Sequence, residues 1–364
     1  MFLYWGRRGA LSQLTLAVAR AAVADRRIEA TVSISRQNES FAAYCELGDA
    51  LLAVDTFHSD WGALTNAWRI PLLQHIVRQR LERARIQAVI TLMPHVWSPF
   101  IAPVVRKAGA RYVTIVHDAV AHKGDSTSLV HGWCLKDIRH ADLVLTLTDT
   151  VAGQLLATGK VTRARLATLF HPDICYGPTI ERRPPVPGEP LRLLFLGRIL
   201  LYKGLPLFLD AVDMLAEKGI AVKVGVFGEG NLGPCATRLT QMDAEVVNRW
   251  LTEAEIGAAL TRYHVLVLSH VEASQSGVAA ASFGGGLPVV ANPIGGLIEQ
   301  VEDGVTGILA KRASAPALAD AIQRLLTEPQ LYRTICENIR KRADQRSATR
   351  FVEQVVAHAL NARA

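Results

Sequence analysis

An α/β protein with two parallel sheets is the fold that this sequence predicts, on three observations. Short β-rich runs alternate with helical stretches along the whole 364-residue chain, as is typical of parallel sheets. Half of the residues are hydrophobic, which is enough to bury a large core. Residues 177–190 hold five prolines, so they suit neither a helix nor a central strand. They divide the chain into two parts of similar size, each expected to be a Rossmann-like domain.

The expected strands are short and mostly apolar, as strands buried on both faces are. They cover residues 2–5, 30–35, 50–54, 87–92, 112–116, 143–147 and 166–170 in the first part, and residues 191–196, 222–227, 265–268 and 288–291 in the second. Helical patterns cover residues 11–23, 72–85, 151–157, 205–218, 253–262 and 315–326. We therefore place a first domain at residues 1–177, a linker at 178–190 and a second domain at 191–345.

The chain is strongly basic, with a formal net charge of +7. Part of the excess lies in two clusters of the first domain, at residues 78–85 and 106–111. Such a charge suits nucleic acid, an anionic membrane surface or anionic small substrates. Nucleic acid is not expected, because no aromatic residues interleave with the basic ones. A solvated helix face and a surface for acidic lipid head groups both remain open.

The cysteines and the start of the chain bear on location. The five cysteines are scattered and form no metal-like pair, which suits a reducing compartment. The first apolar run is too short for a signal peptide and is followed by charge. No apolar run is long enough to cross a bilayer, and no Asp-x-Asp metal motif is present. We expect a cytoplasmic protein that needs neither a metal ion nor another cofactor.

Two cations follow the first strand of the second domain. The turn runs from Gly197 to Gly204, carries Arg198 and Lys203, and leads into a helix. The planar fork of an arginine and the point charge of a lysine together suit a diphosphate, and the glycines permit a tight backbone. Arg198 and Lys203 are therefore candidates for diphosphate binding, with a basic surface turn as the alternative.

A second glycine turn, from Gly228 to Gly230, follows the next strand. Glycines there let the chain pass close to a ligand or to a neighbouring strand. No G-x-G-x-x-G fingerprint follows any expected strand, which argues against a nicotinamide- or flavin-dependent enzyme.

Polar residues follow the strand at residues 265–268. The chain continues through Glu272 and through Ser276, Gly277 and Val278 into an alanine-rich helix. In open α/β sheets, ligands bind at the carboxyl ends of strands, and a helix start offers N–H groups and a positive dipole end to a phosphate. Glu272 is placed to hold sugar hydroxyls, with helix capping as the alternative.

Three histidines follow strands of the first domain. His117 comes directly after the strand at residues 112–116, and it is a candidate to hydrogen-bond a sugar hydroxyl or to move a proton near neutral pH. We interpret His95 and His171, which also lie near strand ends, as structural.

The turn between the first strand and the first helix contains Gly6, Arg7 and Gly9. The two glycines would let a substrate approach the backbone, and Arg7 would meet an anionic acceptor. A plain strand-to-helix turn is the alternative.

In combination, these motifs resemble those of the retaining GT-B glycosyltransferases of family 4, the glycosyl transferases group 1, and among them bacterial enzymes of surface-polysaccharide clusters. The resemblance covers nearly the whole chain and is strongest from residue 191 to residue 309. Further matching pieces are residues 286–291, 295–299 and 303–307. The resemblance implies two Rossmann-like domains facing across a cleft, with a final helix at residues 346–364 that crosses back to the first domain.

The resemblance also implies roles for the matching positions. Arg198 and Lys203 would bind the donor diphosphate and stabilise its charge as it leaves, without a metal ion. Glu272 would hold the donor sugar, and His117 would lie beside the sugar that is transferred. The other donor-side positions are Gly197, Gly228, Gly230, Ser276, Gly277 and Val278. The acceptor-side positions are Gly6, Arg7 and Gly9.

One position departs from the family pattern. The second glutamate of the E-x7-E motif, which holds the nucleotide ribose, falls at Ala281 when the spacing is counted back from Pro288. We expect the missing carboxylate to weaken donor affinity by about 1.5–3 kcal/mol, roughly tenfold to a hundredfold.

The expected function is therefore hexosyl transfer from a GDP- or UDP-sugar to a saccharide or polyprenyl-linked saccharide acceptor. The resemblance implies same-face attack, in which the leaving phosphate takes the proton of the acceptor. An anionic membrane is a further expected partner, which would place the protein at the inner face of the cell membrane. Two alternatives stay open: a nucleotide-sugar epimerase on the same fold, and a degenerate GT-B protein that binds a nucleotide without turnover.

Overall fold

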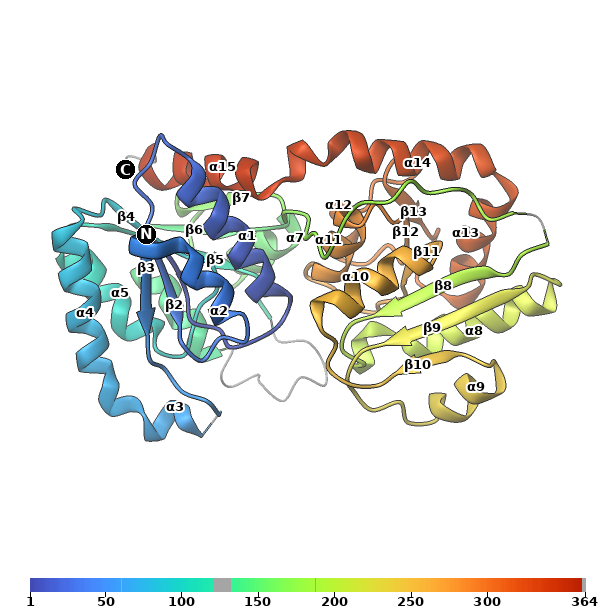
Figure 1. The fold of residues 1–364 in the computed structure, drawn as a ribbon, viewed down its shortest axis with the longest axis horizontal. Helices are drawn as coiled ribbons and strands as arrows, with labels where there is room; N and C mark the ends of the chain where they lie inside the picture. The colour runs from blue at the N-terminus through green and yellow to red at the C-terminus, as the bar shows by residue number, and fades with distance from the viewer. Residues whose placement is uncertain (60, 121–131, 187, 362–364) are drawn as a thin grey trace. The chain divides into compact units, whose positions relative to one another are not determined.

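The computed structural model describes residues 1–59, 61–120, 132–186 and 188–361 (Figure 1). The chain divides into two compact units. The first comprises the described residues up to 172 together with those from 347 onward, and the second comprises residues 173–346. Each unit is built around a parallel β-sheet, with seven strands in the first and six in the second.

The first unit has a sheet in which every neighbouring pair of strands is parallel. Its strands are β1 (Phe2–Tyr4), β2 (Val32–Ser35), β3 (Leu51–Val54), β4 (Ala88–Thr91), β5 (Arg111–Val116), β6 (Leu143–Thr146) and β7 (Leu166–Thr168). The order β3-β2-β1-β4-β5-β6-β7 changes direction between β1 and β4. The loops after these two strands therefore diverge and open the carboxyl edge of the sheet, where open α/β sheets bind ligands.

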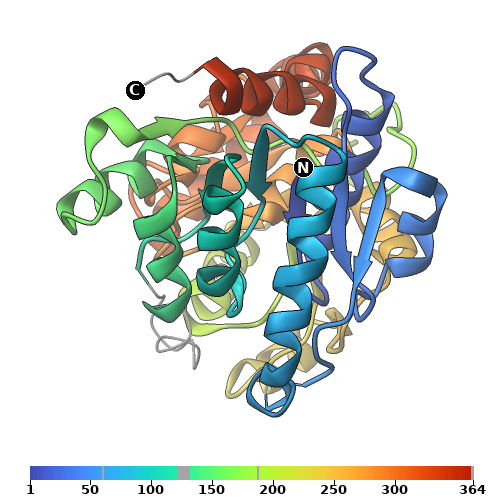
Figure 2. The same cartoon turned by 90° about the vertical axis from the view of Figure 1, so that its left-hand side faces the viewer.

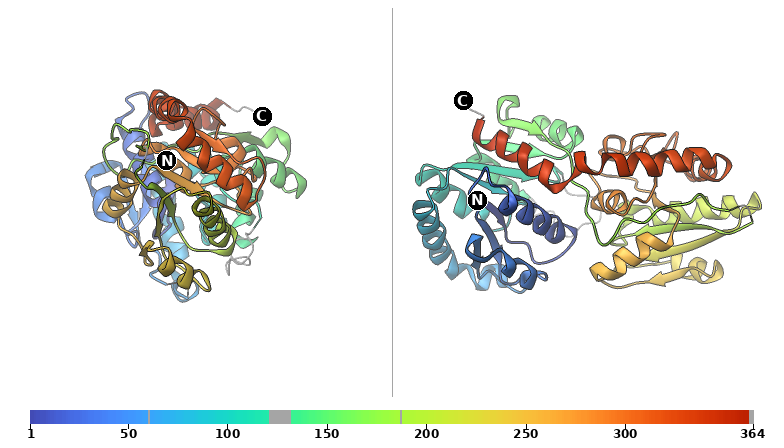
Figure 3. Two further views of the ribbon diagram at one scale, coloured as in Figure 1. Left: turned by 90° about the vertical axis from the view of Figure 1, so that its right-hand side faces the viewer. Right: turned by 45° about the horizontal axis from the view of Figure 1, so that its top comes forward.

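Helices of the first unit cover its sheet, so its central strands are buried on both faces. They are α1 (Ala10–Ala24), α2 (Phe41–Tyr44), α3 (Gly62–Thr65), α4 (Ile70–Arg83), α5 (Ser98–Lys107), α7 (Asp149–Ala157) and α15 (Ala348–Asn361). The last helix returns to this unit and packs along α1 (Figure 3). Figure 2 shows α4 lengthwise on the face turned to the viewer, with α5 beside it.

The second unit repeats this architecture. Its parallel strands are β8 (Leu191–Leu196), β9 (Val222–Phe227), β10 (Glu245–Val247), β11 (Val265–Leu268), β12 (Val289–Ala291) and β13 (Gly307–Leu309). Its helices are α8 (Leu205–Glu217), α9 (Cys235–Gln241), α10 (Glu253–Arg262), α11 (Gly277–Gly284), α12 (Leu297–Gln300), α13 (Ala315–Thr327) and α14 (Pro329–Arg342). The order β10-β9-β8-β11-β12-β13 changes direction between β8 and β11, which opens the carboxyl edge at that point.

Local sequence explains where several helices begin. The Thr252 hydroxyl accepts the N–H of Glu255 at 3.3 Å, and the Glu255 carboxylate accepts the N–H of Thr252 at 2.8 Å. This reciprocal pair satisfies two N–H groups that α10 cannot satisfy within itself. At α13 a single bond serves as the cap, because the Ser314 hydroxyl accepts the N–H of Ala317.

The expected strands are all present, with small differences at their ends. Two further strands, β10 and β13, were not expected. Each is three residues long and lies at an edge of the second sheet, so each is too short to give a clear pattern in the sequence. Helix α5 was also missed, because Pro99 and Pro103 lie within it. A proline in the first turn costs a helix little, since its N–H would lack a helical partner there.

The chain passes between the two units at residues 172–173 and again at 346–347. The two crossings are joined in the second unit, where Asp173 N–H donates to Arg346 O at 2.9 Å and the Asp173 carboxylate pairs with the Arg346 guanidinium at 2.8 Å. Burial raises the pKa of the Asp173 carboxyl to about 6, against the opposing effect of Arg346. The described residues of the proline-rich segment 177–190 form neither helix nor strand.

Within the part of the chain that the structure describes, every helix is too short or too polar to cross a lipid bilayer.

Candidate functional site

The turn after β8 is the centre of the candidate site in the second unit. Gly197 follows the strand with a φ of 104°, and Gly204 begins α8 with a φ of 70°. A Cβ on Gly204 would lie 2.1 Å from the carbonyl oxygen of Ser269. Glycine at 204 is therefore required both by its left-handed backbone and by the close approach of the loop after β11.

Two hydrogen bonds hold that loop against the turn. The Ser269 hydroxyl donates to Lys203 O at 3.0 Å, and the Val271 N–H donates to Tyr202 O at 2.8 Å. Glu272 is the next residue along. The structure thus brings Lys203 and Glu272 to neighbouring loops at the point where the strand order changes direction.

The two cations of the turn differ in exposure. Lys203 is only 9% exposed, and its ammonium lies 5.6 Å from the centre of the Tyr202 ring. Arg198 is exposed, and within the described residues it makes no hydrogen bond or ion pair. A bound anion would be held strongly by the buried ammonium, because the surroundings screen charge weakly. The exposed guanidinium has its donors available for bidentate contact.

The glycine turn after β9 packs directly on the turn after β8. A Cβ on Gly228 would lie 2.1 Å from Gly197 O, and a Cβ on Gly230 would lie 2.3 Å from Ile199 O. The Gly230 N–H donates to the side-chain oxygen of Asn248 at 3.0 Å. These two glycines therefore serve the contact between neighbouring loops, and their contact with a donor stays a prediction.

The start of α11 is also fixed from outside the helix. The Ser276 hydroxyl accepts the N–H of Ala279 at 3.3 Å, and the Ser276 N–H donates to the Gln300 side chain at 2.7 Å. The Ser276 N–H, which was expected to face a ligand, is thus already engaged. The N–H groups that remain for a ligand are those of Gly277 and Val278, since the first residues of a helix have no helical partner for them.

Removing the Gln300 side chain should loosen this helix start. The Gln300→Ala variant leaves the buried Ser276 N–H without an acceptor, so we expect the free energy of unfolding to fall by about 1–3 kcal/mol. Urea denaturation measures the change. The matched control is Gln330→Ala, at an exposed position of α14, which should change stability by less than about 0.5 kcal/mol. Equal effects of the two substitutions would contradict the bracing role of Gln300.

Sequence reasoning missed the side-chain amides that brace the loops of this site. Gln300 holds Ser276, and Asn248 holds Gly230. Asn292, which follows β12, donates to His270 O at 3.1 Å. Two of these amides follow strands directly, a position that could have drawn attention to them. The residues that these amides contact lie far away in the sequence, so no local pattern connects an amide with its partner.

In the first unit, the turn after β1 is braced in a similar way. The Gly9 N–H donates to the Glu39 carboxylate at 2.7 Å, and Gly6 O accepts from the Asn38 amide at 2.8 Å. The Arg7 guanidinium donates to His58 O and lies 5.5 Å from the centre of the Phe57 ring. Arg7 therefore helps to hold the segment after β3, and its contact with an acceptor stays a prediction.

His117 lies at the carboxyl end of β5, as expected, and its Nε2 is 2.7 Å from Leu92 O, just beyond β4. A carbonyl oxygen only accepts, so Nε2 carries a proton. Burial lowers the pKa of His117 below its usual value, which outweighs the smaller opposing effect of this hydrogen bond. The imidazole is therefore neutral near pH 7, with an unprotonated Nδ1. Whether His117 binds a sugar hydroxyl or moves a proton stays a prediction.

His95 is packed among three aromatic rings, with its centroid 5.1–5.8 Å from those of Trp5, Phe57 and Trp97. Its Nδ1 accepts the N–H of Trp97 at 3.2 Å. Burial lowers the pKa of His95 to about 3, with Arg7 adding a smaller effect. This placement agrees with the structural role expected for His95.

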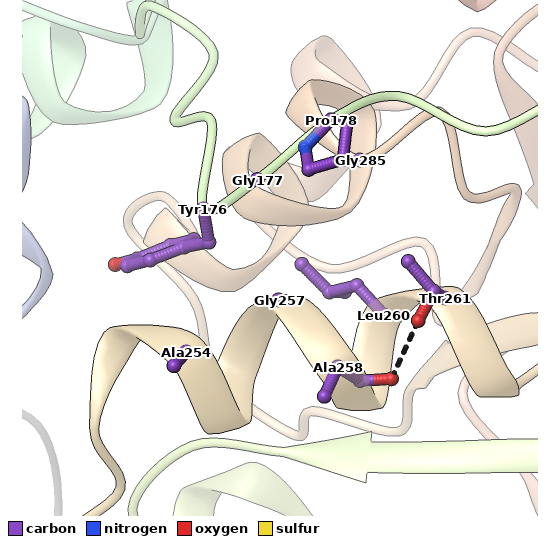
Figure 4. A pocket seen from close by; sticks show the side chains of 9 residues that line it. All are labelled: Tyr176, Gly177, Pro178, Ala254, Gly257, Ala258, Leu260, Thr261 and Gly285. Carbon is purple, nitrogen blue, oxygen red and sulfur yellow. Dashed lines mark hydrogen bonds between the residues drawn. The ribbon is translucent and has the colours of Figure 1, made fainter.

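A separate hollow of about 240 Å³ in the second unit lies between the chain at residues 176–178 and α10 (Figure 4). Glycines and small or aliphatic side chains line most of it, and none of the described residues around it is charged. The hydroxyl of Thr261 is satisfied by Ala258 O at 2.8 Å (Figure 4). The hollow thus lacks the groups that a phosphorylated ligand needs.

The part of the site that lies in the second unit falls within a region that matches a known family. Residues 190–328 match the model described as glycosyl transferases group 1. The chain carries a glycosyl transferases group 1 domain. The resemblance drawn from its motifs is confirmed for this domain.

Curated relatives of the chain are named as glycosyltransferases. The 2-deoxystreptamine glucosyltransferase of Streptomyces kanamyceticus is 26% identical over 296 residues, which are 73% of this chain and 74% of that protein. The putative colanic acid biosynthesis glycosyltransferase WcaL of Escherichia coli is 28% identical over 60% of this chain and 55% of its own length. Most of the curated relatives compared are matched over about half of their length or less.

Solved structures share the fold of the whole chain. The crystal structure of Anabaena HepE in complex with UDP-glucose has a TM-score of 0.73 and 16% identity, and the match covers 100% of this chain and 99% of that one. Together with the two parallel sheets, this likeness confirms the expected GT-B fold.

Ala281 of the glycosyl transferases group 1 domain lies in α11 and is 3% exposed. Its carbonyl accepts the N–H of Gly285 at 3.0 Å. The position therefore offers no carboxylate to a ligand.

Proposed function

We propose that the chain is a retaining glycosyltransferase of family 4 that takes a nucleotide sugar as donor. The observation that carries the proposal is the junction of two loops at the carboxyl edge of the second sheet. Lys203 O and Tyr202 O accept hydrogen bonds from Ser269 and Val271, so the cationic turn and the Glu272 loop form one surface. A nucleoside diphosphate sugar has the matching chemistry, with an anionic diphosphate for the cations and hydroxyls for the carboxylate.

The proposed division of labour follows from the chemistry of each side chain. Arg198 and Lys203 bind the diphosphate and stabilise the charge that grows on it as the sugar leaves, which makes a metal ion unnecessary. Glu272 accepts hydrogen bonds from the sugar, and the N–H groups of Gly277 and Val278 face a phosphate at the positive end of α11. His117 accepts a hydroxyl of the transferred sugar through Nδ1. The acceptor attacks on the face from which the diphosphate departs, and its proton passes to that diphosphate.

Relatives and neighbours support the choice of ligands. HepE was crystallised with UDP-glucose, and WcaL is named for colanic acid biosynthesis. We therefore place UDP-sugars first among the donors, with GDP-sugars second, and we expect a saccharide or lipid-linked saccharide acceptor of bacterial polysaccharide synthesis. The proposed location is the cytoplasm, at the inner face of the cell membrane.

A thermal-shift screen with UDP, GDP, ADP and their sugars tests the proposal. A ligand at a hundred times its dissociation constant should stabilise the protein by about 2.7 kcal/mol. Donor consumption is then followed with and without candidate saccharide acceptors. Acceptor-dependent release of the nucleoside diphosphate is the expected result. Interconversion of the sugar without acceptor would establish an epimerase instead, and binding without any consumption would establish a degenerate protein.

A further inference from the structure

Large apolar side chains are exposed on one segment of the first unit. Trp61 is 80% exposed, Leu64 72%, Trp68 68% and Leu72 54%. By contrast, Trp97, from a neighbouring loop, is 2% exposed. Soluble proteins rarely gather exposed residues of this size without a partner for them. We call these four residues the aromatic patch.

The patch residues share one side of a nearly continuous helical segment. They recur at intervals of three and four residues, from Trp61 directly before α3, through a short 3₁₀ turn (Ala67–Arg69), to the first turn of α4. This spacing is that of residues on one face of a helix. In Figure 2 this segment forms the lower end of α4, on the face turned to the viewer. The opposite face of α4 is buried, through Leu73, Val77 and Leu81.

The patch is held in place by contacts at its base. The indole N–H of Trp97 donates to Ala63 O at 3.1 Å, and the Asn66 amide donates to Gly62 O at 3.1 Å. Gly62 packs so closely on Phe57 that a Cβ would lie 2.9 Å from its Cβ. These contacts fix the backbone of the segment in the position that leaves the four apolar side chains exposed.

Positive charge accompanies the patch. Residues 61–85 contain five arginines and one glutamate. The Arg69 guanidinium lies 5.2 Å from the Trp68 ring centre, and the last turn of α4 carries Arg80 and Arg83. Arg78 pairs with Glu82 at 2.8 Å, but both side chains are more than half exposed. Solvent therefore screens the attraction, and the pair contributes little to stability.

A groove beside the patch has the same mixed character. It lies between α4 and α5, with a volume of about 730 Å³. Phe100, which is 40% exposed, and Pro103 give it apolar walls. Arg78 and Lys107 bring positive charge to it, and Glu82, the partner of Arg78, also lines it. Apolar floor and cationic rim are the combination that suits acyl chains and anionic head groups.

We propose that the aromatic patch, with the cations of α4 and the groove beside it, docks on an anionic lipid bilayer. Tryptophan rings and leucines enter the boundary between head groups and acyl chains, and arginines remain at the level of the phosphates. Shortly before the patch along the chain, His58 O accepts a hydrogen bond from Arg7 of the turn after β1. This docking surface extends the proposed function by naming a membrane as partner. It rests on the proposed function only in taking the acceptor to be carried by a lipid.

Vesicle co-sedimentation of the full chain tests the docking without donor or acceptor, so its outcome is separate from that of glycosyl transfer. We expect binding to phosphatidylcholine vesicles that contain phosphatidylglycerol, and weak binding to vesicles of phosphatidylcholine alone. The Trp61→Ser/Trp68→Ser variant should lower the apparent vesicle affinity by about tenfold or more. The control is Val23→Ser/Val186→Ser, at exposed positions outside the patch, which should bind as the wild type does.

The charge contribution is tested with a second matched pair. Arg78→Gln/Arg83→Gln should weaken binding to the anionic vesicles by roughly tenfold at low salt. Arg340→Gln/Lys341→Gln makes the same change of net charge in the last turn of α14, and it should leave binding unchanged. Equal losses in both variants would show a non-specific charge effect and overturn the proposal.

Brominated lipids show whether the rings enter the bilayer. We expect them to quench tryptophan fluorescence in the wild type and in Trp250→Phe, and the quenching to be largely lost in Trp61→Phe/Trp68→Phe, which keeps an aromatic ring at each position. Unchanged quenching in this last variant would overturn the proposal. So would a wild type that is dimeric in sedimentation velocity and becomes monomeric when both tryptophans are replaced by serine, because a second copy would then cover the patch.

Discussion

The Arg198→Ala and Lys203→Ala variants are each expected to lose about half or more of the stabilisation that the nucleotide gives to the wild-type protein. Each substitution removes a charge-assisted hydrogen bond to the diphosphate, worth about 1.5–3 kcal/mol, or roughly tenfold to a hundredfold in dissociation constant. At a concentration of nucleoside diphosphate that stabilises the wild type by about 2.7 kcal/mol, the variants should keep about 0.4–1.4 kcal/mol. Thermal unfolding with and without nucleotide measures both values.

The control lies on β8, the strand that leads into the turn. Arg192 is exposed near the start of β8, at the edge of the sheet opposite to the turn. The Arg192→Ala variant makes the same change of net charge and should keep the full nucleotide shift. Because Lys203 is buried, Lys203→Met, which retains most of the side-chain volume, separates lost charge from lost packing. A full shift in either alanine variant would remove that residue from the diphosphate site.

The Gly204→Ala variant should be strongly destabilised. Its backbone is left-handed, with a φ of 70°, which costs an alanine about 1–2 kcal/mol. The new Cβ would also lie 2.1 Å from Ser269 O, so the loop after β11 must move. We expect a total loss of about 3–5 kcal/mol in the free energy of unfolding, measured by urea denaturation, together with loss of nucleotide binding.

Gly219, which follows α8, provides the comparison. Its φ is 75°, close to that of Gly204, but a Cβ there would meet nothing within 4 Å. The Gly219→Ala variant therefore isolates the backbone cost, about 1–2 kcal/mol, and should still bind nucleotide. The difference between the two variants reports the close contact between the turn and the loop. Equal destabilisation would show that this contact contributes nothing.

Much of the fold followed from the sequence because buried parallel strands have a strong local signal. Residues 193–196 and 265–268 are continuous apolar runs, and they lie in β8 and β11, which form as expected. The edge strand β10 was missed, because its register on β9 comes from the neighbouring backbone rather than from its own side chains. Helix α5 was hidden by its two prolines.

The candidate site was predicted where its chemistry is local. Arg198 and Lys203 could be singled out because one short turn carries both between a strand and a helix. The brace from Gln300 to Ser276 spans 24 residues, and its amide has no signature of its own. The glycines at 228 and 230 were correctly expected to allow a close approach. That the approach is made by the backbone of the turn after β8 is visible only in the folded structure.

The sequence by itself determined the class of the fold, the order of most strands and helices along the chain, and which short turns carry charge. These features are local, because apolar runs, prolines and glycines set the conformation of the backbone around them. Tertiary structure decided which loops meet. The strand order places β11 beside β8, and so brings Lys203 against Ser269, 66 residues away along the chain. Burial likewise lowers the pKa of His117, since the removal of water from an imidazole depends on everything that packs around it.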